Sequence, residues 1–124
     1  MINLNALKQK VKNLIESELT PNVFYDVVPN NVKTGCLIIK SVTDFVGRTV
    51  DGEAHIAHHS FEIVIFSFEN GDVCDELTST LVEKTDGKCS KDFRLIEVNS
   101  ITPTQYEPDT GFWANAVSME FVER

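Results

Sequence analysis

The sequence predicts an α+β domain, in which two helices pack on one face of a mainly antiparallel β-sheet. Two segments carry apolar residues at helical spacing, and five others are β-rich or alternate between apolar and polar residues. Proline and glycine, next to Thr, Asn or Asp, separate most of these segments. The predicted element order is therefore α-β-β-β-α-β-β. No internal repeat or linker divides the 124 residues, so we expect one domain over residues 1–124.

The first predicted helix covers residues 4–19. Lysines and Glu16 occupy the face opposite its apolar residues. Thr20-Pro21 ends the helix, because proline disfavours helical backbone at the residue before it. The apolar face is formed by Leu4, Leu7, Val11, Leu14, Ile15 and Leu19. We therefore expect an amphipathic helix of about four turns that packs on the sheet.

Two strands are predicted next. Residues 23–28 are β-rich but are cut by Pro29, which is typical of a short edge strand. Residues 36–42 form a strand that is apolar on both faces. The polar stretch after it, residues 43–53, contains two glycines and predicts either a loop or a protruding hairpin that turns at Asp51-Gly52.

Residues 61–68 form the most apolar predicted strand. One face carries Phe61, Ile63 and Ile65, and the other carries Val64, Phe66 and Phe68. Both faces of this strand therefore need to be covered.

The second predicted helix follows this strand and ends near Thr85. The segment 70–72 breaks the strand, and the Asp72 carboxylate is well placed to cap the free amides of the first helical turn. Asp86-Gly87 stops the helix. Its buried stripe is predicted to contain Val73, Leu77 and Leu81, with Cys74 and Thr80 beside them.

The last two strands are predicted at residues 93–101 and 112–122, as an antiparallel pair. The connection between them is rich in turn residues, with two prolines and a glycine. Trp113 is expected to anchor the final strand in the core. A ligand-binding lip formed by Trp113 and Tyr106 is the alternative.

The charge balance argues against nucleic-acid recognition. The sequence has 19 acidic residues against 11 Lys and Arg, a net charge of −8, so DNA phosphates would be repelled. No apolar run approaches the roughly 18 residues that a membrane span requires, and the N-terminus lacks signal-peptide features. Three widely spaced cysteines do not suggest a disulfide framework. We expect a protein made in the cytosol, with no membrane partner.

The histidines and cysteines do not predict a metal or catalytic site. On an extended chain His55 and His59 lie about 13 Å apart, at about 3.3 Å per residue, which is too far to share one ion. Adjacent His58 and His59 point to opposite faces of a strand. Cys36 and Cys74 occupy positions where small buried residues are expected.

The carboxylates Asp72, Asp75 and Glu76 are close in sequence. Their predicted place in the first turn of a helix explains them without catalysis, because the helix dipole favours negative charge there. No nucleophile, base and orienting group converge in the sequence. We therefore predict that the protein is not an enzyme and uses no metal or other cofactor.

The whole arrangement resembles the tail terminator and tail completion (head–tail joining) proteins of long-tailed bacteriophages, of the lambda tail terminator type. The likeness lies in the order and residue pattern of segments that span nearly the whole chain. These segments are LNALKQKVKNLIESEL, VFYDVVP, CLIIKSV, HHSFEIVIFSF, GDVCDELTSTLVEK, FRLIEVNSI and FWANAVSMEFV.

The resemblance implies a structural virion protein that forms a ring, usually a hexamer, at the head-proximal end of the tail. Such a ring ends the growth of the tail tube and provides the joint to the head. The implied partners are further copies of the chain, the tail tube protein and the head–tail connector proteins. DNA would only pass through as cargo, without specific binding. The expected location is the neck region of the virion, and the host cytoplasm during assembly.

Residues 43–53 are assigned to an exposed assembly loop, because charged and apolar side chains alternate there with glycines. In the alternative, Phe45 and Val46 extend the preceding strand into the core. The predicted interface residues are Asp44, Phe45, Val46, Arg48, Val50, Asp51 and Glu53.

Two other functions stay open at this point. A head completion ring, which binds the connector, would have a similar fold. A small ligand-binding α+β domain would instead use a pocket lined by Tyr106, Trp113 and the histidines.

Overall fold

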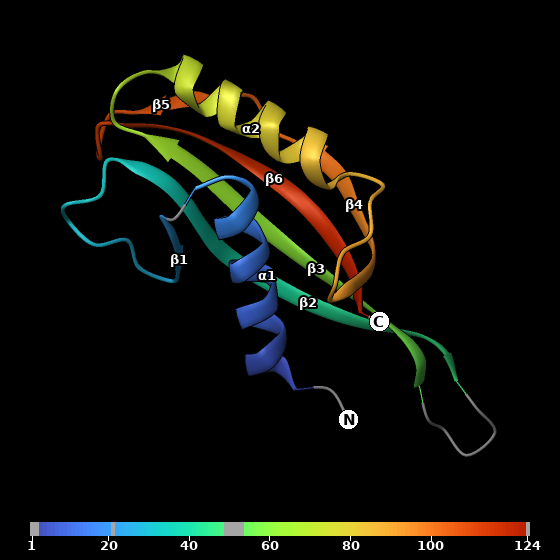
Figure 1. Ribbon diagram of the computed structural model, residues 1–124. Helices are drawn as coiled ribbons and strands as arrows, with labels where there is room; N and C mark the ends of the chain where they lie inside the picture. The colour runs from blue at the N-terminus through green and yellow to red at the C-terminus, as the bar shows by residue number, and fades with distance from the viewer. Residues whose placement is uncertain (1–2, 21, 49–53, 124) are drawn as a thin grey trace.

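The computed structural model describes residues 3–20, 22–48 and 54–123. Within these residues both helices lie on one face of a six-stranded sheet, so the predicted α+β class is confirmed (Figure 1). The elements are α1 (Leu4–Glu18), β1 (Val23–Tyr25), β2 (Thr34–Arg48), β3 (Ala54–Ser67), α2 (Gly71–Thr85), β4 (Phe93–Ile101), β5 (Gln105–Glu107) and β6 (Phe112–Glu123).

The strand order is β1-β2-β3-β6-β4, and β5 pairs with the beginning of β6 beyond the end of β4. Only β1 runs parallel to its neighbour, β2; the other pairs in the described sheet are antiparallel. The predicted edge strand at 23–28 is confirmed at the edge but is shorter. It ends where Asp26 adopts a left-handed conformation, with φ of 65°.

The structure corrects the sequence prediction at residues 43–48. These residues are not a loop but the second half of β2, because their backbone pairs with β3 from Thr43–His59 to Arg48–Ala54. The hairpin alternative therefore describes them correctly. Its predicted turn at 51–52 lies outside the described residues. Strand β5 is a second difference, since the sequence predicts only turns between β4 and β6.

The beginning of α2 is also different from the prediction. Asn70, not Asp72, is the N-cap: its side-chain Oδ1 accepts a hydrogen bond from the Val73 amide at 3.1 Å. Both side chains are able to cap a helix, and the backbone enters the helix two residues earlier than predicted. Asp72 consequently lies within the first turn, whereas Asp75 and Glu76 lie beyond it. The helix dipole accounts for Asp72 alone.

One apolar core lies between the helices and the sheet. Phe121 of β6 is at its centre, with the Phe61 ring edge-on at 5.6 Å and the Phe93 ring tilted at 4.9 Å. These three rings are fully buried. From the helices the core receives Leu7, Val11, Ile15, Cys74 and Leu81. Each was predicted on the apolar side of its helix, so the helical periodicity identified the packed faces.

The opposite face of the sheet carries no helix among the described residues. Phe66 of β3 is nevertheless buried there, because the Phe112 ring of β6 packs edge-on against it at 5.5 Å. Val64 is half-buried and Phe68 is 50% exposed. The expectation that β3 is covered on both faces is therefore met only in part, by side chains of the same sheet.

We expect Gly35→Ala to lower the free energy of unfolding by about 1–3 kcal/mol, the usual range for overpacking. A Cβ at position 35 would lie 2.5 Å from the Asn22 carbonyl oxygen, which accepts the Cys36 amide at 2.8 Å. The change therefore forces β1 away from β2. Urea denaturation measures the effect, with Cys89→Ala, at an exposed position, as the control. Equal stability of both variants would mean that β1 shifts without cost.

Candidate assembly surfaces

The β2–β3 hairpin projects beyond the rest of the sheet. Strand β6 pairs with β3 only from His58 to Ser67, so from Phe45–Ala57 to Arg48–Ala54 the two strands pair with each other and with no further described strand. This ribbon leaves the body of the molecule at the lower right of Figure 1. Its described part extends about 14 Å past Asp44, at about 3.4 Å per residue. Two strands without a packed face are marginally stable in water, so such an arm is suited to be held by a partner.

The predicted interface residues that the structure describes lie on this arm or, for Asp44, at its root. Asp44 is exposed and lies opposite His58. Phe45 extends the strand, as the alternative prediction expects, but it is 46% exposed and is not part of the core. Val46 and Arg48 belong to the same strand. Outside the described residues lie Val50, Asp51 and Glu53.

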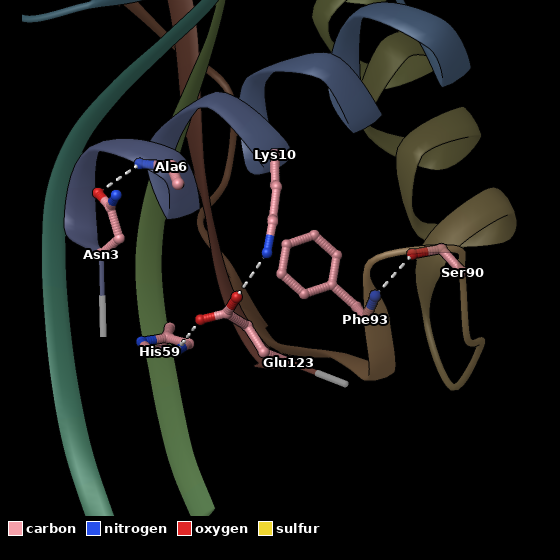
Figure 2. Close-up of polar contacts among 7 residues, drawn as sticks. All are labelled: Asn3, Ala6, Lys10, His59, Ser90, Phe93 and Glu123. Atoms are coloured by element: carbon pink, nitrogen blue, oxygen red, sulfur yellow. Dashed lines mark hydrogen bonds and ion pairs between the residues drawn. The ribbon is translucent and has the colours of Figure 1, made fainter. Parts of the chain in front are cut away.

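A polar network holds the root of the arm. His59 of β3 is fully buried; its Nε2 lies 3.1 Å from Glu123 Oε1, and its Nδ1 lies 2.9 Å from Thr43 Oγ1. Glu123 also accepts a hydrogen bond from Lys10 Nζ at 2.9 Å (Figure 2). A neutral imidazole with its proton on Nε2 satisfies both contacts, because it donates to the carboxylate and accepts from the hydroxyl. The network thus joins α1, β2, β3 and β6 where the arm begins.

The electrostatics of this network favour a neutral histidine. Burial lowers the pKa of His59, and the nearby Glu123 carboxylate only partly opposes this. In turn, the hydrogen bond and negative charge of Glu123 raise the pKa of Lys10. At neutral pH the network therefore contains one ion pair, Lys10–Glu123, and one uncharged imidazole.

The other histidine and the buried cysteines have separate environments. As predicted, His58 points to the opposite face, where its Nδ1 contacts Glu120 Oε1. Burial raises the pKa of Cys36 to about 12 and that of Cys74 to about 11, which is consistent with structural thiols. Within the described part of the chain no three His, Cys, Asp or Glu side chains are grouped as metal ligands.

The uncovered face of the sheet is the second surface of interest. Ile39, at a bulge in β2, is 48% exposed, and Val42 is 43% exposed. A depression of about 320 Å³ lies beside Val42, where Ser60 and Ser118 present only small side chains. The outer edge of β2 bears β1 only from Cys36 to Ile38; past that point no described strand pairs with it. An open apolar face next to an open edge is a surface that another chain can cover.

The residues proposed for a ligand pocket do not come together. The rings of Tyr106 and Trp113 pack at 5.1 Å, with Trp113 opposite Ser67. His59 lies opposite Phe121, eight residues further along β6, or about 26 Å at about 3.3 Å per residue. The alternative prediction of a ligand pocket shared by these residues is therefore wrong. Trp113 instead packs against the core, as the preferred prediction states.

Comparison with known proteins identifies the fold but no sequence family. No protein-family model matches the chain, and no curated protein matches it. A chain of a solved structure described as the virion of a native gene transfer agent (GTA) particle is similar, with a TM-score of 0.63. The match covers 96% of this chain and 91% of that chain, at 12% sequence identity. At that identity the likeness establishes a shared fold. None of the described helices is long and apolar enough to cross a membrane.

The lowered pKa of His59 predicts a loss of stability in mild acid. The unfolded chain binds the proton first as the pH falls below about 6.5, so stability is full above that pH and declines below it. We expect the melting temperature to fall between about pH 7.5 and about pH 5.5. His59→Gln retains an N–H donor for Glu123 and should flatten this slope, whereas His58→Gln, the control, should retain it. An unchanged slope in His59→Gln would show that other groups cause the pH dependence.

Proposed function

We propose that the protein is a structural component of a phage-like virion, and that it forms a ring at the head-proximal end of the tail. In this role it ends the growth of the tail tube and provides the joint to the head connector, with no catalytic step and no cofactor. The observation that carries the proposal is the fold shared with a chain of the gene transfer agent virion, over 96% of this chain.

The protruding arm supports an assembly role. Its Phe45 side chain is 46% exposed on a two-stranded ribbon, and Asp44 is exposed beside it. The root of the same ribbon is tied to α1 and β6 through His59 and Glu123. A fixed root, with Asp44 and Phe45 exposed next to it, lets the arm reach a neighbouring ring or tube without rearranging the subunit.

The open sheet face and the open edge of β2 support association with further copies of the chain. Ile39 and Val42 expose apolar area there. They lie beside the edge of β2 with which no described strand pairs beyond Ile38, and an unpaired edge is a place where another chain can add. The net charge of −8 suits a channel through which DNA moves, because it offers phosphates no retention.

We expect the protein to form a ring of six subunits, with a mass about six times the 13.9 kDa of one chain. Light scattering of the purified protein, alone and with tail tubes, measures this mass. Binding to tube ends but not to DNA-filled heads lacking tails separates the terminator from a head completion ring. A chain that is monomeric both in solution and in purified virions contradicts the proposal.

Replacing Phe45, Val46 and Val50 together by Ser should leave the subunit folded but disable assembly. Phe45 lies outside the core, so the melting temperature should fall by no more than a few degrees, as for other surface changes. Assembly in the presence of the variant should give overgrown or headless tails, seen by electron microscopy. Val27→Ser, at a 74% exposed apolar residue away from the arm, is the matched control. Strong destabilisation of the triple variant would instead assign the segment to the core.

A further inference from the structure

The solvent face of α2 carries an acidic patch near its N-terminal end, defined here as Asp72, Asp75 and Glu76. All three side chains are exposed, and none forms an ion pair with another residue of the described chain. The helix dipole accounts only for Asp72, the one acid in the first turn. Asp75 accepts a hydrogen bond from the Thr104 hydroxyl at 2.7 Å. The patch therefore presents negative charge that the subunit itself does not neutralise.

A buried acceptor without a partner lies beside this patch. Asn115 lines a depression of about 450 Å³ between α2 and the β4–β5 connection, whose lining also includes Asp75 and Thr104. Asn115 is 5% exposed; its Nδ2 donates to Thr78 Oγ1 at 2.8 Å, and its Oδ1 has no partner within the described residues. Exchanging the side-chain oxygen and nitrogen of Asn115 would not give the oxygen a donor, because the Thr78 hydroxyl already donates its hydrogen to the Cys74 carbonyl. A buried polar atom without a partner is destabilising, so a donor from outside would be favourable here.

The opposite end of α2 carries a basic corner, defined here as Lys84, Lys88, Lys91 and Arg94. These are four of the 11 Lys and Arg of the chain; all are exposed, and none is paired with an acid in the described structure. Of the two acids in the same stretch, Asp92 is half-buried and Asp86 accepts the Val98 amide at 2.9 Å. Lys84 lies in the last turn of α2, and the other three basic residues come after the helix in the chain. The 15 residues of α2 span about 22 Å, at about 1.5 Å per residue.

We propose that the acidic patch of one copy binds the basic corner of the next copy, so that subunits associate head to tail. The inference rests on the proposed ring and names its contact between subunits. A Lys or Arg of the corner enters the depression, pairs with Asp75 and donates to Asn115 Oδ1, after the exposed Thr104–Asp75 hydrogen bond opens. Two different patches at opposite ends of one helix form a heterologous contact, which closes into a ring when the rotation between copies fits. Complementary charge also sets the orientation of the partners.

Charge reversal tests this contact in the full-length chain. Asp75→Lys with Glu76→Lys makes the patch basic, and Lys88→Glu with Lys91→Glu puts two carboxylates into the corner and cancels its positive charge. Each double variant alone should associate at least about ten-fold more weakly than the parent, because the attraction between patch and corner is reversed in the first variant and lost in the second. Light scattering over a range of protein concentrations measures the association, and added salt should weaken that of the parent chain.

Mixing the two variants in equal amounts is the decisive experiment. The basic patch of one variant then faces the two introduced carboxylates of the other, and the unchanged acidic patch faces the unchanged basic corner. An alternating ring of even number therefore restores every contact, and the mixture should regain the mass of the parent assembly. The controls change the net charge equally elsewhere: Glu107→Lys with Asp109→Lys, and Lys8→Glu with Lys12→Glu. Both control variants should associate like the parent.

The outcomes separate this inference from the proposed function. A parent that never associates, even on tail tubes, overturns both. An assembling parent with variants of unchanged mass, or a mixture that fails to regain mass, overturns the charged contact and leaves the ring in place. Melting curves confirm that each variant folds. Where a reversal unfolds the chain, the neutral pairs Asp75→Asn with Glu76→Gln and Lys88→Gln with Lys91→Gln replace it and should weaken association in the same direction.

Discussion

The packing of both helices on one face of a single sheet is the constraint on which the other features depend. The rings of Phe61, Phe93 and Phe121 fill the space under α1 and α2. Strand β4, which carries Phe93, is interrupted by two irregularities, whereas β3 and β6 alternate between the two faces of the sheet. Every second residue of these strands therefore lies on a face without a helix in the described structure. On that face, β6 exposes little apolar area because its side chains are small, and the rings of Phe66 and Phe112 pack against each other. What remains uncovered, near Ile39 and Val42, is the apolar surface available for assembly.

Unequal strand lengths add the second assembly feature. Strands β2 and β3 have 15 and 14 residues, whereas β6 pairs with β3 over only its last ten rows. The hairpin must therefore leave the core, and the point of departure needs a fixed direction. Thr43, His59 and Glu123 provide it through hydrogen bonds, which depend on angle more than apolar contacts do. Because His59 is buried and neutral, the direction is held without burying an unpaired charge.

Sequence reasoning predicted those parts of the fold that local pattern determines. Helical spacing identified Leu7, Val11 and Ile15 as buried, and alternation placed His58 and His59 on opposite faces. It did not predict the features that depend on contacts between residues in different segments of the chain. Residues 43–48 are polar enough for a loop and become a strand only because 54–59 lie beside them. Asn70 and Asp72 are equally able to cap a helix, so residue type alone does not decide between them.

The candidate surfaces were predicted less completely, for the same reason. Lys10 and Glu123 are 113 positions apart, and no local signal joins them. The unpaired Asn115 amide becomes noticeable only once α2 and the β4–β5 connection enclose it. The predicted interface residues, by contrast, stood out through local composition alone, since Asp44 and Phe45 place a charge and an aromatic ring side by side. Composition therefore reveals exposed elements, while contacts between distant segments require the fold.

Charge and apolar area would have different consequences for the proposed ring subunit, which would have to stay dispersed before it assembles. Large exposed apolar patches would drive association in any orientation, whereas the patches here are small and separate. A net charge of −8 adds a general repulsion between copies. The basic corner lies at one end of α2 and the acidic patch lies near the other. Two copies placed so that the corner of one faces the patch of the next would therefore attract each other locally, despite the general repulsion. Each contact of the proposed kind would be weak in water, but a closed ring or a tail end that held several copies together would make the contacts reinforce one another. Such assembly would depend on the template more than on the strength of any single interface.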